Sequence, residues 1–419
     1  MALSRREMLA LGLASIPAAT RRSRKASAQM LQSSGMDGQK NSALDRTIQM
    51  VSIPSYSHMS SKPIADYVET AIKDLGFVTE RLEYTDTRSD PKGILKVNVI
   101  GKKGNLAGGF ALSGHMDTVP ADTWTEGSPF QPFVRDGRLY GRGVCDMKGP
   151  IACMMEAASR FPVAQLKKSI YLVFSSDEEI GGGASRIVAR SQLFREIVTN
   201  SVPMVIGEPT LMEVVYSHKA GWSFTATAHG RAGHTSRDIG FNANLKLIPF
   251  LAEMKKMHDE VTTDRRWFNT EYDPPHIVWN IRMKDGTTAS NIYPPLSTCT
   301  VSCRTMPKVD LKALADRVKA TADAMGLDLT MGNTSPRFYY VDPNSPYIHD
   351  LLAINGKTKP LTAPYGTDAG SYFPGGAKIL AISGPGSIDQ AHTDDEWINL
   401  AQLDAGVDSY VKMIKFYCM

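Results

Sequence analysis

Helix-like and strand-like segments alternate along the first half of the chain, and this alternation constrains the fold more than any other feature. Between residues 45 and about 212, amphipathic stretches at 64–75 and 151–160 separate short apolar runs at 110–113, 170–174 and 204–206. Apolar runs that alternate with helices are typical of parallel strands joined by helical crossovers. We therefore predict an α/β domain with a largely parallel sheet.

A different pattern begins near Ser217. Apolar side chains occupy every second position from Trp222 to Ala228, as in a strand with one buried face. Further segments predict helices at 243–258 and 311–325 and strands at 277–283 and 298–303, and the α/β pattern returns with a helix at 346–355 and a strand at 377–382. We predict a discontinuous main domain, 45–216 and 333–419, interrupted by an α+β insert at 217–332.

Charge and cysteine content exclude several classes of protein. The formal charge is +4, but residues 1–28 contain six basic side chains and one acidic one, so the remainder carries −1. A near-neutral chain without a basic stripe lacks the electrostatic signature of nucleic-acid binding. Five cysteines without a CxxC pair predict buried thiols and neither a disulfide framework nor a thiolate zinc site.

The N-terminus resembles a twin-arginine export signal. Arg5 and Arg6 precede an apolar run at 9–19, and Ala26-Ser27-Ala28 offers a cleavage site. The apolar run is too short to span a bilayer. We predict an export signal at 1–28 and a periplasmic protein with no further membrane contact, the alternative being a cytoplasmic protein with an irregular N-terminal extension.

The apolar run at 110–113 leads to His115 and Asp117. The two-residue period of a strand places both side chains on one face. His115 could then bind a metal ion while Asp117 accepts the other ring N–H, which fixes the tautomer. The alternative is a hydrogen-bonded pair at the end of a strand.

Four more segments place acids or a histidine near strand ends. Glycines bracket Asp146 ahead of a helix, three successive acids follow the run at 170–174, Glu208 follows the run at 204–206, and His392 lies in a glycine-rich loop. Three adjacent acids repel one another unless a cation lies among them. A helix cap at Asp146, a solvated acidic turn and ordinary loops are the alternatives. Because ligands of open α/β sheets bind at the carboxyl ends of the strands, the five segments together predict one polar site.

These segments resemble those of the co-catalytic zinc amidohydrolase and metallopeptidase family that includes acetylornithine deacetylase, succinyl-diaminopimelate desuccinylase, aminoacylase and carboxypeptidase G. The resemblance extends from about residue 45 to the end, and GEPT at 207–210 and GPGSIDQAH at 384–392 look most like acetylornithine deacetylase. It implies one zinc ion held by His115, Asp146 and Glu208, and a second held by Asp146, Glu179 and His392. It also implies that Glu178 is the general base.

Electrostatics supports a shared carboxylate in such a site. Two divalent ions ~3.5 Å apart repel by roughly 19 kcal/mol even at an effective dielectric constant of ~20, so bridging anions are required. Three carboxylates and a hydroxide balance four positive charges, and two imidazoles complete a nitrogen and oxygen set that suits zinc, with cobalt or manganese as substitutes.

The resemblance also implies residues that contact the substrate. His234 would reach the active site of a partner subunit and stabilise the oxyanion, which implies a homodimer formed through the insert. Asn291 and Arg304 would meet the substrate carboxylate, while Gly366 and Thr367 would line the pocket. A surface histidine and a surface arginine are the alternatives for His234 and Arg304. We predict no role for the remaining histidines, which are His58, His218, His229, His258, His276 and His349.

The function expected from this resemblance is hydrolysis of the amide bond of a small N-acyl amino acid. Export argues for a scavenging carboxypeptidase or dipeptidase of the same fold, because arginine biosynthesis is cytoplasmic. A protein that binds metal without catalysis is the alternative from another class. Such a protein would be expected to lose Glu178, which contributes nothing to holding zinc.

Overall fold

The computed structural model describes residues 43–419, apart from 88–89, 238, 287–288, 333 and 335–336. The export signal predicted at 1–28 lies outside the described residues. Within the described part of the chain, no helix combines the length and the apolar character needed to cross a membrane.

Eight strands form a mixed sheet whose central strands run parallel. They are β1 (Val78–Asp86), β2 (Ile94–Lys103), β3 (Gly109–His115), β6 (Ser169–Ser175), β7 (Met204–Ile206), β8 (Val215–His218), β13 (Leu361–Ala363) and β14 (Leu380–Ile382). Their order is β1-β2-β6-β3-β7-β14-β8-β13. Strand β3 pairs in parallel with β6 and β7, and β7 with β14, whereas β1–β2, β2–β6 and β14–β8 are antiparallel. The predicted α/β class is confirmed.

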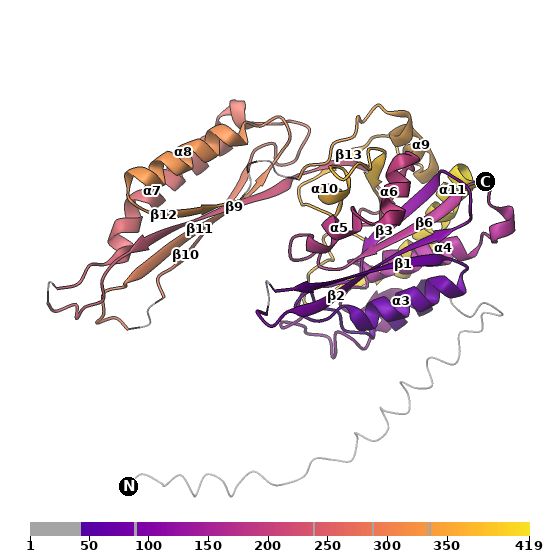
Figure 1. Cartoon of the computed structure of the whole chain (residues 1–419), viewed down its shortest axis with the longest axis horizontal. Coiled ribbons are helices and arrows are strands. Elements are labelled where there is room, and N and C mark those ends of the chain that lie inside the picture. The colour runs from indigo at the N-terminus through magenta and orange to yellow at the C-terminus, as the bar shows by residue number, and fades with distance from the viewer. Residues whose placement is uncertain (1–42, 88–89, 238, 287–288, 333, 335–336) are drawn as a thin grey trace, which may run out of the picture. The chain divides into compact units, whose positions relative to one another are not determined.

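Helices cover this sheet (Figure 1). They are α2 (Ala43–Val51), α3 (Lys62–Asp74), α4 (Lys148–Ser159), α5 (Gly183–Val188), α6 (Gln192–Thr199), α9 (Pro346–Asn355), α10 (Ala369–Tyr372) and α11 (Leu400–Cys418), with a 3-10 turn at Val163–Gln165. Helices α4 and α11 pack on β3 and on each other, α3 packs on β1 and β2, and α5 and α6 contact β2. Every residue of β3 and β6 is buried, which explains why both strands are continuous apolar runs.

The insert contains a four-stranded antiparallel sheet of order β10-β11-β9-β12. Its elements are β9 (Ala220–His229), β10 (Val278–Lys284), β11 (Leu296–Thr305), β12 (Asp328–Met331), α7 (Ala243–Thr263), α8 (Leu311–Ala324) and a 3-10 turn at Arg265–Trp267. Helices α7 and α8 lie along this sheet (Figure 1) and share with it a separate hydrophobic core. Because β8 still pairs in the larger sheet, the chain changes sheets at Lys219, two residues after the predicted boundary.

A third sheet is small but positions the site. It joins β4 (Phe133–Arg135), β5 (Arg138–Tyr140) and β15 (Trp397–Asn399). The pairing of β15 with β5 brings the segment before α11 next to the loop that follows β5. All five cysteines are buried free thiols, as predicted.

Candidate metal centre

Two groups of potential metal ligands lie at the carboxyl edge of the larger sheet. His115, Asp146 and Glu208 form one group, and Asp146, Glu179 and His392 form the other. Within each group, one ligand atom from each residue lies within 4.8 Å of the others. The structure therefore brings together all five residues expected to bind metal, although they come from segments up to 277 residues apart.

Asp146 belongs to both groups. Its Oδ1 lies 3.0 Å from Nε2 of His115, and its Oδ2 lies 3.3 Å from Nε2 of His392. Glu179 Oε1 lies 3.1 Å from the same His392 nitrogen, and Glu208 Oε1 lies 3.9 Å from Nε2 of His115. Each oxygen of Asp146 thus faces a different imidazole, which is the arrangement of a carboxylate that bridges two cations.

The chemistry of these groups fits two divalent metal ions. Burial together with the charge of Asp146 raises the pKa of both Glu179 and Glu208, and the carboxylates of Asp146 and Glu179 raise the pKa of His392 to about 10. The crowded carboxylates thus stabilise any positive charge that is bound between them, whether a proton or a metal ion. Three carboxylates and two imidazoles are a donor set that zinc prefers.

Asp117 organises the site through its backbone as well as its carboxylate. Nδ1 of His115 donates to the Asp117 carbonyl at 3.0 Å, whereas the Asp117 carboxylate lies 3.5 Å from that nitrogen. The carboxylate accepts hydrogen bonds from the Ser57 hydroxyl and from the backbone N–H groups of Glu178 and Glu179. The closest acceptor for Nδ1 is therefore the carbonyl. This contact directs Nε2 of His115 toward Asp146 and Glu208, the other members of its ligand group.

The acidic turn after β6 consists of Asp177, Glu178 and Glu179, and its three side chains have different surroundings. Asp177 adopts a left-handed φ of 60°, which turns the chain beyond the end of the strand. Its buried carboxylate lies 2.6 Å from Lys96 Nζ, so a lysine rather than a metal ion neutralises this acid. Glu179 joins the second ligand group, whereas Glu178 lines the adjacent cavity and belongs to neither group. Burial and the nearby charge of Glu208 raise the pKa of Glu178 well above its usual value.

Glu396 holds the loop that carries Asp146, although no role was predicted for this residue from the sequence. The carboxylate is 1% exposed. Its Oε2 accepts hydrogen bonds from Arg142 Nη1 at 3.0 Å and from the Gly143 N–H at 2.9 Å. Its Oε1 accepts from the N–H groups of Cys145 and Asp146 at 2.9 and 3.0 Å. In the sequence this residue is one of three adjacent acids after His392, and nothing distinguishes it from a solvated side chain.

A cavity of about 680 Å³ opens beside the two ligand groups. Glu178 and three predicted substrate-binding residues line it, namely Arg304, Gly366 and Thr367. Two further predicted residues, His234 and Asn291, are not among the residues that line it. They are neighbours on the insert, where the Thr235 N–H donates to the Asn291 carbonyl, and His234 is exposed.

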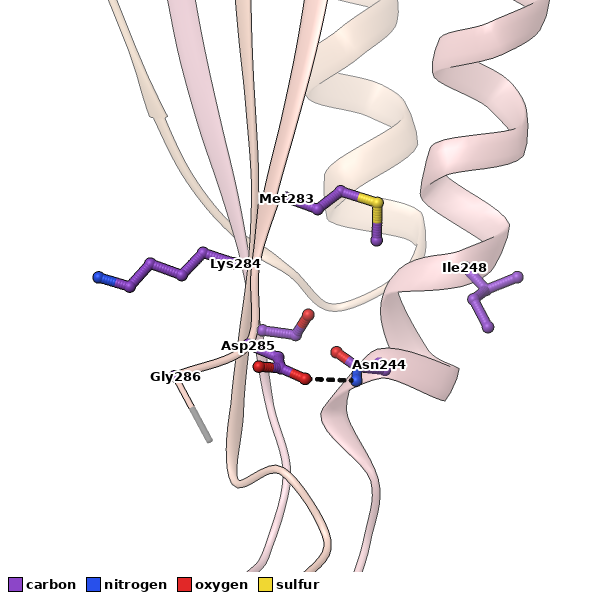
Figure 2. A pocket seen from close by; sticks show the side chains of 7 residues that line it. Asn244, Ile248, Met283, Lys284, Asp285 and Gly286 are labelled. Atoms are coloured by element: carbon purple, nitrogen blue, oxygen red, sulfur yellow. Dashed lines mark hydrogen bonds between the residues drawn. The ribbon is translucent and has the colours of Figure 1, made fainter. Parts of the chain in front are cut away.

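A second hollow, of about 620 Å³, lies within the insert between α7 and β10. Figure 2 shows Ile248 and Met283 on its two sides and the hydrogen bond from Asn244 Nδ2 to Asp285 Oδ2, at 3.2 Å. Ile248 is 53% exposed and Met283 is 59% exposed. This hollow therefore presents apolar surface and contains none of the clustered ligands.

His218 also lines the large cavity, although no role was predicted for it. The side chain is buried, and Nδ1 donates to the Lys219 carbonyl at 2.8 Å. Burial lowers the pKa of His218 to about 4. The imidazole is therefore neutral near pH 7.

This neutral histidine predicts a loss of stability in acid. The unfolded chain binds a proton at His218 near the usual pKa of 6.5, whereas the folded chain resists it until about pH 4, so stability falls as the pH drops through this range. Between pH 7.5 and 5 we expect the wild type to lose about 2 kcal/mol more unfolding free energy than His218→Gln. Urea unfolding at both pH values measures this, with His349→Gln, at an exposed histidine, as the control. Equal losses in wild type and His218→Gln would contradict the assignment.

The α/β domain, the two ligand groups that share a carboxylate and the separate antiparallel sheet are the arrangement expected of a metallohydrolase that holds two metal ions. The model of peptidase family M20/M25/M40 matches residues 111–415, and the chain belongs to this family. The chain is 27% identical over 366 residues to an acetylornithine deacetylase of Myxococcus xanthus. This match covers 85% of the chain and 92% of the relative.

Solved structures share the fold. An M20 family metallo-carboxypeptidase from Sulfolobus solfataricus superposes with a TM-score of 0.68 at 17% identity, covering 90% of this chain and 99% of the other. Human carnosine dipeptidase 1 superposes with a TM-score of 0.65 at 15% identity, covering 89% and 97%. These likenesses confirm the predicted architecture of a mostly parallel domain with an antiparallel insert.

Proposed function

We propose that the chain is a metal-dependent amidohydrolase that cleaves the amide bond of an N-acyl amino acid, in the manner of acetylornithine deacetylase. The observation that carries this proposal is the sharing of Asp146 between two ligand groups, with Glu178 beside them in neither group. The likeness to acetylornithine deacetylase supports an acyl amino acid as substrate. The alternative function is that of a carboxypeptidase or dipeptidase of the same fold.

The proposed metal ions are two zinc ions, which cobalt or manganese could replace. His115, Asp146 and Glu208 would hold one ion, and Asp146, Glu179 and His392 the other. When bound, the metal would supply Lewis-acid stabilisation of the negative charge that develops on the amide oxygen and would acidify a water molecule.

The remaining chemistry belongs to side chains of this chain. Glu178 would take a proton from the attacking water and return it to the nitrogen of the leaving amine. The hydrogen bond from its N–H to Asp117 fixes the backbone at this point. Arg304 would bind the substrate carboxylate with two parallel N–H groups, while Gly366 and Thr367 form the adjacent wall. A protein that binds metal without catalysis would have no use for Glu178 in this position.

A substrate panel tests the proposal. Zinc-loaded protein is assayed for release of free amine from N-acetylornithine, N-acetylmethionine, N-acetylglutamine and two dipeptides, with chelated protein as the control. We expect the acyl amino acids to be hydrolysed faster than the dipeptides. Faster cleavage of dipeptides would favour the carboxypeptidase or dipeptidase alternative. Metal binding without turnover of any substrate would favour a non-catalytic role.

We further propose a homodimer formed through the insert. Four of its apolar side chains are at least half exposed, namely Ile239, Leu245, Ile248 and Met283, and Figure 2 shows the last two beside one hollow. An exposed apolar surface of this kind is typical of a subunit contact. His234 is exposed and does not line the cavity of its own chain, which fits a role in the cavity of a partner subunit.

Mixed dimers test whether His234 acts across the interface. His234→Ala and Glu178→Gln each remove one required group, so each homodimer is expected to have little activity. In a mixed dimer one cavity receives an intact Glu178 from its own chain and an intact His234 from the other. Equal mixing, after subunit exchange, is therefore expected to restore about one quarter of wild-type activity. Mixtures no more active than their parents would show that His234 does not act in trans.

A further inference from the structure

Two arginines line the cavity, and neither forms an ion pair with any described residue. Arg304 comes from β11, where its Nη1 lies against Gly221 of β9. Arg337 comes from the segment after β12, and its Nη1 donates to the Ser371 hydroxyl of α10 at 3.3 Å. The two guanidinium groups therefore belong to different walls of the cavity. A guanidinium that lacks a carboxylate partner at a cavity wall is available to an anionic ligand.

The surroundings of Arg337 add positive rather than negative charge. Burial and the charge of Arg186 on α5 lower the pKa of Arg337, and no carboxylate among the described residues opposes this effect. The acids that line the cavity all belong to the ligand groups or to the acidic turn, and these are Asp146, Glu178, Glu179 and Glu208. An anion bound at Arg337 would therefore balance a charge that the described residues leave uncompensated.

The same distribution of charge disfavours a cationic side chain on the substrate. An ammonium group such as that of ornithine needs a carboxylate partner when it leaves water. The four lining carboxylates belong to the metal groups or are assigned to proton transfer, and none of them forms an ion pair with Arg337. Arg337 and Ser371, which line the cavity, with Arg186 of α5 near Arg337, instead offer hydrogen-bond donors and positive charge.

We propose that Arg337 and the Ser371 hydroxyl form a second carboxylate site, so that the preferred substrate carries two carboxylates. This inference rests on the proposed hydrolysis of an N-acyl amino acid and specifies its substrate class. One carboxylate is the α-carboxylate, bound at Arg304. The second carboxylate stands at the end of either the amino-acid side chain or the acyl group. Arg337 recognises a carboxylate in both cases.

Two matched substrate pairs distinguish these sources. N-acetylglutamate against N-acetylglutamine tests the side chain, and N-succinylalanine against N-butyrylalanine tests the acyl group. We expect the wild type to prefer the acidic member of one pair by at least about tenfold in kcat/KM, because an ionic hydrogen-bonded contact is worth at least that factor. Arg337→Gln is expected to abolish this preference by raising KM, with kcat and the neutral substrates little changed.

A control variant and a binding measurement make the test decisive. Arg190→Gln removes an exposed arginine near α5 that does not line the cavity, and it is expected to keep the preference. Calorimetry with glutarate and butyrate is expected to show at least about tenfold tighter binding of the dicarboxylate to wild type, and no such difference in Arg337→Gln. Equal binding of both acids, or an unchanged preference in Arg337→Gln, would overturn the inference. If this inference fails but the proposed function holds, the neutral acyl amino acids are still hydrolysed. If the proposed function itself fails, no member of either substrate pair is hydrolysed.

Discussion

Glu178→Gln is expected to lower kcat by about 10² to 10⁴-fold, because the amide cannot take a proton from water or return it to the leaving nitrogen. Glu178 lines the cavity but belongs to neither ligand group, so the bound metal should be unchanged. The size and shape of the side chain are conserved by the substitution. The loss should therefore appear in kcat, with little change in KM. Steady-state kinetics and elemental analysis of the same preparation measure both quantities.

The adjacent glutamate provides the matched comparison. Glu179→Gln changes the same chemical group one residue further on, but Glu179 contacts His392 within the second ligand group. We expect this variant to lose metal as well as activity, and added zinc to restore part of the activity. If Glu178→Gln kept wild-type turnover, or if it lost metal as Glu179→Gln is expected to do, Glu178 would not be the general base.

Glu396→Gln is expected to lower the free energy of unfolding by about 3 to 5 kcal/mol, the usual cost of removing one partner of a buried ion pair. Arg142 would stay buried without a counter-ion, and one of the two oxygens that accept from the N–H groups of Gly143, Cys145 and Asp146 would become an NH2 group that cannot accept. The loop that carries Asp146 should loosen as a result. Urea unfolding of the metal-free protein measures the stability, and competition with a chelator measures the affinity for zinc.

An exposed ion pair supplies the control for this variant. Glu126 pairs with Arg135 at 3.1 Å, but the two side chains are 36% and 48% exposed. Glu126→Gln should therefore cost less than about 1 kcal/mol and leave zinc affinity unchanged. Equal effects of the two substitutions would mean that Glu396 does not hold the loop.

The parts of the fold that the sequence predicts are those whose burial leaves a local pattern. Strands β3 and β6 are buried on both faces and read as apolar runs, and the buried and exposed residues of β9 alternate. Strand β1 has no such pattern because most of its residues are partly exposed at the edge of the sheet. It was therefore not predicted, although it pairs along its whole length with β2.

The same distinction applies to the candidate site, where some features leave a local sequence pattern and others depend on tertiary contacts. Four of the predicted metal ligands come at or after the end of a strand that local sequence defines, and Asp146 precedes a predicted helix, so the convergence of the five ligands follows from the fold class. The divergence of Glu178 and Glu179 depends on the left-handed turn at Asp177, which the sequence does not reveal. Glu396 acts on a loop some 250 residues away, and Arg337 meets Ser371 only after the chain returns from the insert. Such roles arise from tertiary contacts and leave no local pattern.

The most direct test of the central claim is the zinc content of the dialysed protein and of two ligand variants. We predict two zinc ions per chain in the wild type, about one in His392→Ala, which removes a ligand of the second group alone, and less than one in Asp146→Ala, which removes the ligand shared by both groups. A wild type that binds no zinc, cobalt or manganese, or an Asp146→Ala variant that retains two ions, would contradict the account.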